Sequence, residues 1–217
     1  MRHSIGMTTI TSRVRTVSRR EGYLLVAILA AALLWSAIGA KSLGTWALEV
    51  VWIFLGAPLV LLNRRRFPLT RLVCWLLVGH ALVLCYGGHY TYAQTPLGDW
   101  LRDVFDWQRN DYDRIAHFVQ GFVPAMLVRE LLLRLTPLRR GGWTFTLTTA
   151  VCLSVSACFE FVEWASAVIL GAGADDFLGT QGDQWDMFLC LCGAIVAQLV
   201  LSRVHDRQLR LTSAPMS

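Results

Sequence analysis

The stretch YLLVAILAAALLWSAIGA, residues 23–40, decides the fold class of this chain. It contains no Asp, Glu, Lys or Arg. A helix needs ~20 predominantly apolar residues to cross a bilayer, because the hydrocarbon core cannot satisfy exposed backbone groups. This stretch therefore predicts a membrane-spanning helix.

Similar apolar segments follow along the chain. They are Trp46–Leu62, Leu72–Tyr92, Tyr112–Leu135, Trp143–Leu170 and Trp185–Val204. Hydrophobic residues make up 55% of the 217 residues and charged residues only 16%, which lies outside the usual range of soluble domains. The sequence therefore predicts an all-α integral membrane protein with about six transmembrane helices.

The cysteines and the net charge fit the same class. All six cysteines lie inside apolar runs, whereas a secreted disulfide framework would place them in aqueous loops, so we expect reduced packing residues. The net charge of +5 comes from short Arg clusters between the apolar runs and not from a continuous basic face. We therefore expect the lipid bilayer, and no nucleic acid, as a partner.

The basic residues predict which side of the membrane each loop occupies, because short cytoplasmic loops retain Lys and Arg. A cytoplasmic N-terminus puts fifteen of the twenty basic residues on the inner side: Arg2, Arg13, Arg15, Arg19, Arg20, Arg64, Arg65, Arg66, Arg71, Arg134, Arg139, Arg140, Arg203, Arg207 and Arg210. We therefore expect both termini in the cytoplasm, with the loops Ala93–Asp111 and Gly171–Gln184 outside.

The predicted organisation has three parts: an N-terminal cytoplasmic tail of residues 1–21, a membrane domain of residues 22–205 and a C-terminal cytoplasmic tail of residues 206–217. A cleaved signal peptide is the alternative for the N-terminus, because a basic region precedes an apolar run that ends in small residues at Ala37 and Ala40. Its removal would leave one span fewer. The regular alternation of the basic loops favours an uncleaved first span.

The segment Leu97–Gln108 predicts an amphipathic helix between the third and fourth spans. Leu97, Trp100, Leu101 and Val104 recur at helical spacing, while charged residues occupy the other face. We expect this helix to lie flat on the outer leaflet with its aromatic side chains in the interface. A lid that packs on the ends of the spans is the alternative.

Acidic residues gather on the predicted outer side. They are Asp99, Asp103, Asp106, Asp111, Asp113, Asp175, Asp176, Asp183 and Asp186. Solvated outer-face charge explains most of them. Asn110 with Asp113, and Asp183 with Asp186, also fit an N-cap followed by a first-turn acid that the helix dipole favours, because each pair stands three residues apart where a span begins.

Glu160 and Glu163 need another explanation. They lie inside the fifth span, where an acidic residue costs ~2.5–3.5 kcal/mol on insertion scales, so both are expected to face protein or water. Their spacing of three places them on one helix face. Counting ~1.5 Å per residue back from Leu170 puts both in the outer half of the membrane.

His117 lies at a similar depth in the fourth span. Asp113, His117 and Gln120 share one helix face, and Asp186 begins the sixth span at the same side. Three spans therefore bring polar side chains to one level. The sequence predicts an outward-opening polar site there, with structural hydrogen bonding and capping as the alternative.

The residue types at this level suit acid–base chemistry or a divalent cation, because carboxylates and imidazole can hold such an ion and the ion can polarise a phosphoryl oxygen. The candidate catalytic residues are His117, Glu160, Glu163 and Asp186. The candidate ligands of the cation are Asp113, His117, Glu160, Glu163, Asp183 and Asp186. Glu130 and Arg134 lie elsewhere, four residues apart near the inner end of the fourth span, and predict a structural ion pair.

Four stretches resemble the YjdF family of uncharacterised bacterial inner-membrane proteins. They are HYTYAQTPLGDWL (residues 89–101), RNDYDRIAHFVQGFVPAMLVRELLLR (109–134), FEFVEWA (159–165) and FLGTQGDQWDMF (177–188). The family carries a few more residues before the Asp that precedes Met187, which leaves the family equivalent of Asp183 open. The resemblance implies a multi-pass protein of the bacterial inner membrane and no known reaction.

A weaker likeness is to VanZ-like membrane proteins, which are linked to resistance to glycopeptide antibiotics. The residues that match this pattern are Asp113, Arg114, His117 and Phe118, then Glu160 and Glu163, then Asp186 and Gly193. The Asn usually found four residues after the last Asp is replaced here by Cys190. This likeness also implies no reaction.

Three kinds of function fit these observations. The first is a membrane enzyme that acts on a lipid or lipid-linked headgroup, the second a proton- or cation-coupled transport or binding protein, and the third a scaffold whose polar cluster only holds helices together. No EF-hand loop, His-Glu-x-x-His, P-loop or Gly-x-Ser-x-Gly motif is present in the sequence. The absence of an internal repeat favours an outward-facing site without transport. The sequence leaves the ligand and the oligomeric state open.

Overall fold

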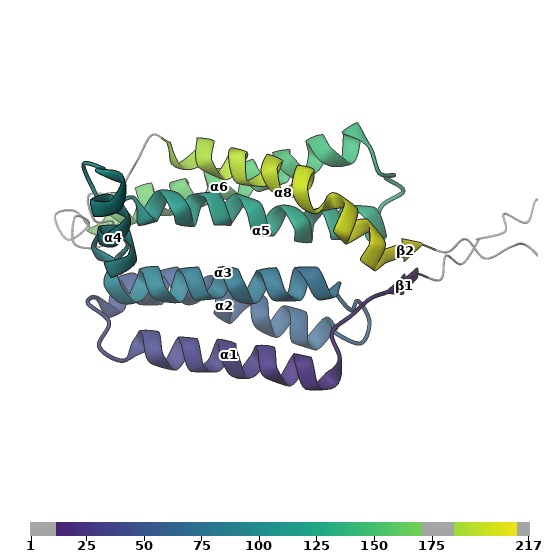
Figure 1. Cartoon of the computed structure of the whole chain (residues 1–217), viewed down its shortest axis with the longest axis horizontal. Coiled ribbons are helices and arrows are strands. Elements are labelled where there is room, and N and C mark those ends of the chain that lie inside the picture. The colour runs from purple at the N-terminus through teal and green to yellow at the C-terminus, as the bar shows by residue number, and fades with distance from the viewer. Residues whose placement is uncertain (1–11, 171–184, 212–217) are drawn as a thin grey trace, which may run out of the picture.

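The computed structural model describes residues 12–170 and 185–211 of the chain. Its long helices run along one another, and a shorter helix lies at one end of the bundle (Figure 1). The helices are α1 (Arg19–Ala37), α2 (Leu43–Asn63), α3 (Arg71–Tyr90), α4 (Pro96–Phe105), α5 (Tyr112–Leu135), α6 (Gly142–Leu170) and α8 (Asp186–Gln208). A 3-10 turn, η1 (Tyr92–Gln94), and two short strands, β1 (Ser12–Val14) and β2 (Leu209–Leu211), complete the described elements.

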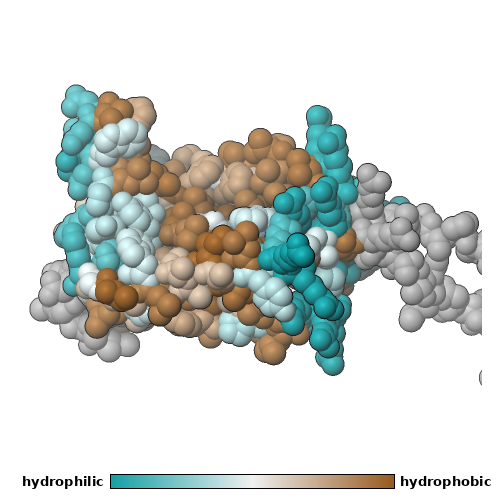
Figure 2. Space-filling model, turned by 60° about the horizontal axis from the view of Figure 1, so that its bottom comes forward, coloured by the Kyte–Doolittle hydropathy of each residue, from teal (hydrophilic) through white to brown (hydrophobic). Residues whose placement is uncertain are grey.

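Six helices are long and apolar enough to cross a membrane: α1, α2, α3, α5, α6 and α8. Figure 2 shows an apolar belt between two hydrophilic ends on the face in view. Large apolar side chains on this belt are exposed, for example Leu34 at 67% and Leu199 at 71%, which suits contact with lipid tails. The predicted multi-pass all-α membrane fold is confirmed.

Capping residues explain where the first helices begin. α1 starts at Arg19, four residues before the predicted start, because Ser18 and Glu21 form a reciprocal capping box. α2 starts at Leu43, where the Ser42 hydroxyl accepts a hydrogen bond from the Thr45 amide. The hydropathy pattern places the apolar centre of each span correctly, but the polar caps add further turns.

A short ribbon joins the two ends of the chain. β1 pairs with β2 in antiparallel register, and the Arg71 amide donates to the Arg15 carbonyl at 2.9 Å. The Gln208 side chain also accepts a hydrogen bond from the Leu72 amide at 2.8 Å. The chain therefore enters and leaves the bundle at one end (Figure 1), as an even number of spans requires. The sequence did not predict this ribbon.

α4 lies at the opposite end of the bundle and occupies the region predicted to be an amphipathic helix (Figure 1). This end is called the outer end, and the end with the ribbon the inner end, after the sidedness predicted from the basic residues. Pro96 stands in its first turn, and the helix ends at Asp106, whose positive φ of 53° stops the helical path. Its apolar side chains at Trp100, Val104 and Phe105 are exposed and not packed on the spans. This exposure favours a helix in the lipid interface over a packed lid.

α5 and α8 approach each other closely enough for their backbones to touch. A Cβ added to Gly121 of α5 would overlap the Cys190 carbonyl of α8, and a Cβ added to Gly193 would overlap the Phe118 carbonyl of α5. Small residues permit such close helix packing in membranes. This contact sets the distance between the outer ends of α5 and α8.

An apolar layer lies further in along the same helices. Met126 of α5, Cys152 of α6, and Ala194 and Ala197 of α8 are buried together in one cluster. The six cysteines are free in the structure, as predicted. The layer separates the outer ends of these helices from their inner ends.

Candidate functional site

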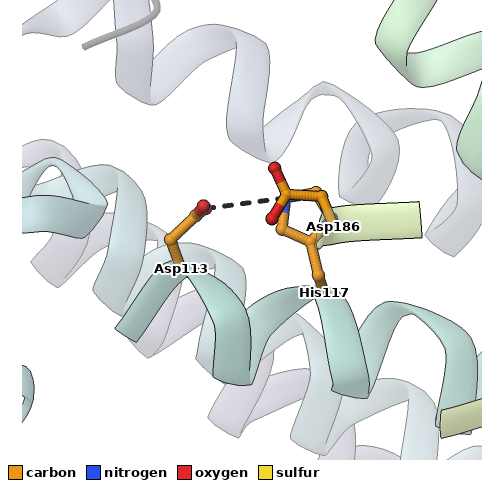
Figure 3. Close-up of side chains that lie close together, drawn as sticks. All are labelled: Asp113, His117 and Asp186. Carbon is orange, nitrogen blue, oxygen red and sulfur yellow. Dashed lines mark ion pairs between the residues drawn. The ribbon is translucent and has the colours of Figure 1, made fainter. Parts of the chain in front are cut away.

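The outer ends of α5 and α8 bring three ionisable side chains together (Figure 3). Asp113 and His117 come from the first two turns of α5, and Asp186 is the first residue of α8. Their exposed fractions are only 8%, 6% and 3%. One ligand atom of each residue lies within 4.8 Å of the other two.

The distances within this cluster suit a shared ion. His117 Nε2 lies 3.6 Å from Asp113 Oδ1 and 3.7 Å from Asp186 Oδ2. Both distances exceed the range of a direct hydrogen bond. Ligand atoms held ~2.1 Å from one tetrahedral cation would lie ~3.4 Å apart. The two distances from His117 are therefore close to the spacing of a coordination shell, and the third pair of ligand atoms lies within 4.8 Å.

The sequence spacing and the helix contact together produce this arrangement. Asp113 and His117 are four residues apart, so they share one face of α5. Gly121 and Gly193 bring that face against α8, so Asp186 comes to lie beside His117. Both helices begin at this end of the bundle, and their positive dipole ends favour ionised carboxylates there.

The predicted capping role of Asn110 is wrong. The N-cap residue of α5 is Asp111, and that of α8 is Trp185; neither side chain makes a capping hydrogen bond. Asn110 instead accepts a hydrogen bond from the Tyr112 amide and donates to the Thr95 carbonyl. It therefore fastens α4 to the start of α5, because Thr95 is the N-cap of α4.

The other predicted site residues are placed as follows. Glu160 and Glu163 belong to α6, but their side chains lie outside the described part of the structure. Asp183 also lies outside the described residues. Gln120 of α5 is half-buried and makes no hydrogen bond to Asp113, His117 or Asp186 within the described residues.

A further acidic residue lies near this end of the bundle. Glu49 of α2 accepts a 2.8 Å hydrogen bond from the Tyr92 hydroxyl. Tyr92 lies in η1, outside the spanning helices, where burial, Glu49 and Asp113 raise the pKa of its phenol well above the usual range. The phenol therefore keeps its proton and donates it. Glu49 was not predicted as a site residue, although a single acid in the apolar run Trp46–Leu62 is itself a signal of a functional or buried polar group.

A second polar cluster occupies the inner ends of the helices. Glu130, which is fully buried, accepts hydrogen bonds from Thr70 Oγ1 at 2.7 Å and from Arg134 at 2.6 Å. The predicted pair of Glu130 and Arg134 is therefore confirmed. His205 Nε2 lies 3.1 Å from the same carboxylate. Glu130 thus joins the start of α3 to α5 and α8.

The partners of His205 fix which ring nitrogen carries the proton. Arg129 can only donate, so His205 Nδ1 accepts its hydrogen bond at 2.8 Å. Nε2 therefore carries the proton and donates it to Glu130. Arg129 also pairs with Asp206 at 2.7 Å. The sequence analysis missed this role of His205 because it ended the sixth span at Val204.

Comparison with known proteins agrees with this architecture. Residues 22–207 match the family described as "Predicted membrane protein (DUF2238)". The chain is 43% identical over 182 residues to the inner membrane protein YjdF of Escherichia coli (strain K12), which covers 82% of this chain and 87% of that protein. The chain belongs to the YjdF family. No solved structure matches it.

Membership of the YjdF family supports a multi-pass protein of the inner membrane. Asp113, His117 and Asp186 all lie within the matched residues 22–207. Neither description names a reaction or a ligand. The arrangement of the cluster must therefore carry any functional argument.

Proposed function

We propose that Asp113, His117 and Asp186 bind one divalent cation, and that this site acts on the phosphate of a lipid or lipid-linked headgroup in the outer leaflet. The observation that carries the proposal is the convergence of three buried ligand atoms within 4.8 Å. One imidazole nitrogen and two carboxylate oxygens suit Zn²⁺ or Mn²⁺. Two carboxylates also supply the negative charge that balances such an ion.

The position of the cluster supports a lipid headgroup as the substrate class. α4 exposes an apolar face suited to the membrane interface, and Asn110 fastens it beside the start of α5. A headgroup in that interface would approach Asp113 and Asp186 at the outer ends of their helices. The phosphate is the group that a bound cation would polarise.

The residues of this chain would then divide the work. Asp113, His117 and Asp186 hold and orient the cation, which would polarise the phosphoryl oxygen or activate water. Glu160 and Glu163 are the proposed general base and acid, because they follow the buried Ser156 of α6 at helical spacings of four and seven. This assignment of Glu160 and Glu163 rests on the sequence.

The apolar layer argues against a transport path within the described residues. Met126, Cys152 and Ala194 fill the space between α5, α6 and α8 inward of the cluster. A transporter would need polar groups or water to continue to the other side. An outward-facing site without transport therefore fits better.

Isothermal titration of the purified protein in detergent with Zn²⁺ and Mn²⁺ tests the cation. We expect one ion per chain, with affinity reduced roughly tenfold or more in His117→Ala and Asp186→Asn. Asp103→Asn is the matched control, because Asp103 is an exposed acid of α4 paired with Arg102. Equal affinity in all four proteins would refute the site.

A soluble lipid phosphate, dioctanoyl phosphatidic acid, tests the headgroup. We expect Mn²⁺ to increase its binding to the wild type and not to Asp186→Asn. Binding that does not depend on the cation would refute the proposed role of the site. A double variant, Glu160→Gln with Glu163→Gln, that loses stability but binds cation and lipid phosphate normally would instead show that these two residues only hold the helices together.

A further inference from the structure

The inner end of the bundle contains a cavity that the proposed outer site does not use. Its volume is about 460 Å³, and it lies between the start of α6 and the last turns of α8. Arg129, Gly142, Phe145, Leu199 and Arg203 are among its lining residues. Volumes of ~300–1,000 Å³ are usual for small-molecule sites.

The cavity reaches from buried side chains of the bundle, such as Arg129 and Gln198, to exposed ones on its surface. Leu199, one of its walls, is 71% exposed on the apolar belt. Trp143, next to Gly142 in α6, is 75% exposed. Aromatic side chains such as Trp143 are typical of the membrane interface, which places the cavity at the level of lipid headgroups.

The charge around the cavity is positive. Arg203 lines the cavity and has no ion pair within the described residues. Asp206 is the carboxylate nearby, and it is already shared by Arg129 at 2.7 Å and Arg140 at 3.1 Å. Two guanidinium groups thus share one carboxylate, and Arg203 adds a further positive charge at the wall of the cavity. This excess of positive charge suits an anion.

We propose that this cavity binds an anionic phospholipid of the leaflet on the side of the termini. The phosphate lies against Arg203 and Arg129, and one acyl chain runs along Leu199 and Phe145. Basic pockets between transmembrane helices on the cytoplasmic side are known to bind anionic headgroups. The apolar wall suits a lipid better than a free anion, because an acyl chain can pack along Leu199 and Phe145 while a free anion would contact only the polar side chains.

This site is independent of the outer cluster, since the apolar layer of Met126, Cys152 and Ala194 separates them. Two variants alter it in different ways. Arg203→Gln removes the unpaired charge. Gly142→Leu adds an apolar side chain at the lining of the cavity without changing charge, and a Cβ at Gly142 meets no atom within 4 Å, so the fold has room for it.

Native mass spectrometry of the purified full chain measures retention of phosphatidylglycerol and phosphatidylethanolamine. We expect the wild type to retain phosphatidylglycerol preferentially. Arg203→Gln should lower that retention about fivefold, the loss expected for one basic contact with an anionic headgroup. Gly142→Leu should also lower it, because its side chain competes with the acyl chain. Arg207→Gln and Gly79→Leu are matched controls, because Arg207 does not line the cavity and a Cβ at Gly79 also meets open space.

Equal retention of the two lipids by the wild type would overturn the proposal, as would normal phosphatidylglycerol retention by Gly142→Leu. Displacement of the lipid by inorganic phosphate alone would show a free-anion site instead. Thermal unfolding of each variant is recorded alongside. If Arg203→Gln unfolds, Gly142→Leu decides the outcome.

Discussion

At the scale of single residues, Glu130 shows how a charge is kept inside this membrane protein. Its carboxylate is fully buried, yet Thr70, Arg134 and His205 all bond to it. An unpaired carboxylate at such a place would cost several kcal/mol, but these partners compensate for lost water. His205 accepts a hydrogen bond from Arg129 at its other ring nitrogen, so both nitrogens of the imidazole have a partner in the network.

Replacing one member of this network should therefore destabilise the fold. Glu130→Gln leaves Arg134 buried without its carboxylate, and we expect a loss of ~3–5 kcal/mol in the free energy of unfolding. Thermal or denaturant unfolding in detergent measures it. Asp103→Asn is the control, since its partner Arg102 is a surface residue and no measurable change is expected. A Glu130→Gln protein as stable as the wild type would show that this network does not contribute to the free energy of unfolding.

At the scale of helices, the glycine contact between α5 and α8 decides the geometry of the outer cluster. Hydropathy assigns both helices to the membrane but does not say which neighbours touch. Gly121 and Gly193 allow the two backbones to meet, and Asp186 then lies 3.7 Å from His117. A side chain at either glycine would need the helices to move apart.

Gly193→Ala should accordingly disturb both stability and cation binding. The added Cβ would overlap the Phe118 carbonyl, so we expect a lower unfolding temperature and weaker Mn²⁺ binding in titration. Gly79→Ala is the control. Its Cβ meets open space in α3 and Ala favours a helix, so stability should be unchanged or higher. If Gly193→Ala lowers the unfolding temperature but leaves the Mn²⁺ affinity normal, the contact between α5 and α8 does not control the proposed cation site.

At the scale of the whole molecule, the β1–β2 ribbon constrains the topology. It pairs Ser12–Val14 with Leu209–Leu211, so the described chain enters and leaves the bundle at one end. The distribution of Arg and Lys predicts that this end is cytoplasmic. The α4 end of the bundle, with Asp113 and Asp186, is then the outer side.

Reporter fusions test this sidedness. A fluorescent-protein fusion after Leu211 should be fluorescent and an alkaline-phosphatase fusion there inactive, because the cytoplasm supports only the first. Fusions after Trp107, in the loop that follows α4, should give the opposite pattern. An external signal after Leu211 would contradict the inward orientation, and with it the proposed side of both the cation site and the lipid cavity.

The sequence by itself determined the number and position of the spans, since a bilayer imposes its requirement locally: each crossing needs its own apolar run. It also predicted the pair of Glu130 and Arg134, because residues four apart on a helix are neighbours in any fold. The long matching motifs were enough to indicate the YjdF family, which the comparison then confirmed.

Only the tertiary structure decided which distant residues meet. Depth along a helix could be counted, so Asp113, His117 and Asp186 were predicted at one level. The depth of a residue along its helix, however, does not fix how the helix is rotated or which helices are its neighbours. The contact between Glu130 and His205 and the pairing of β1 with β2 join residues far apart in the sequence, so no local pattern predicts them. These contacts depend on which helix faces touch, and that is set by backbone shape at Gly121 and Gly193, not by hydropathy.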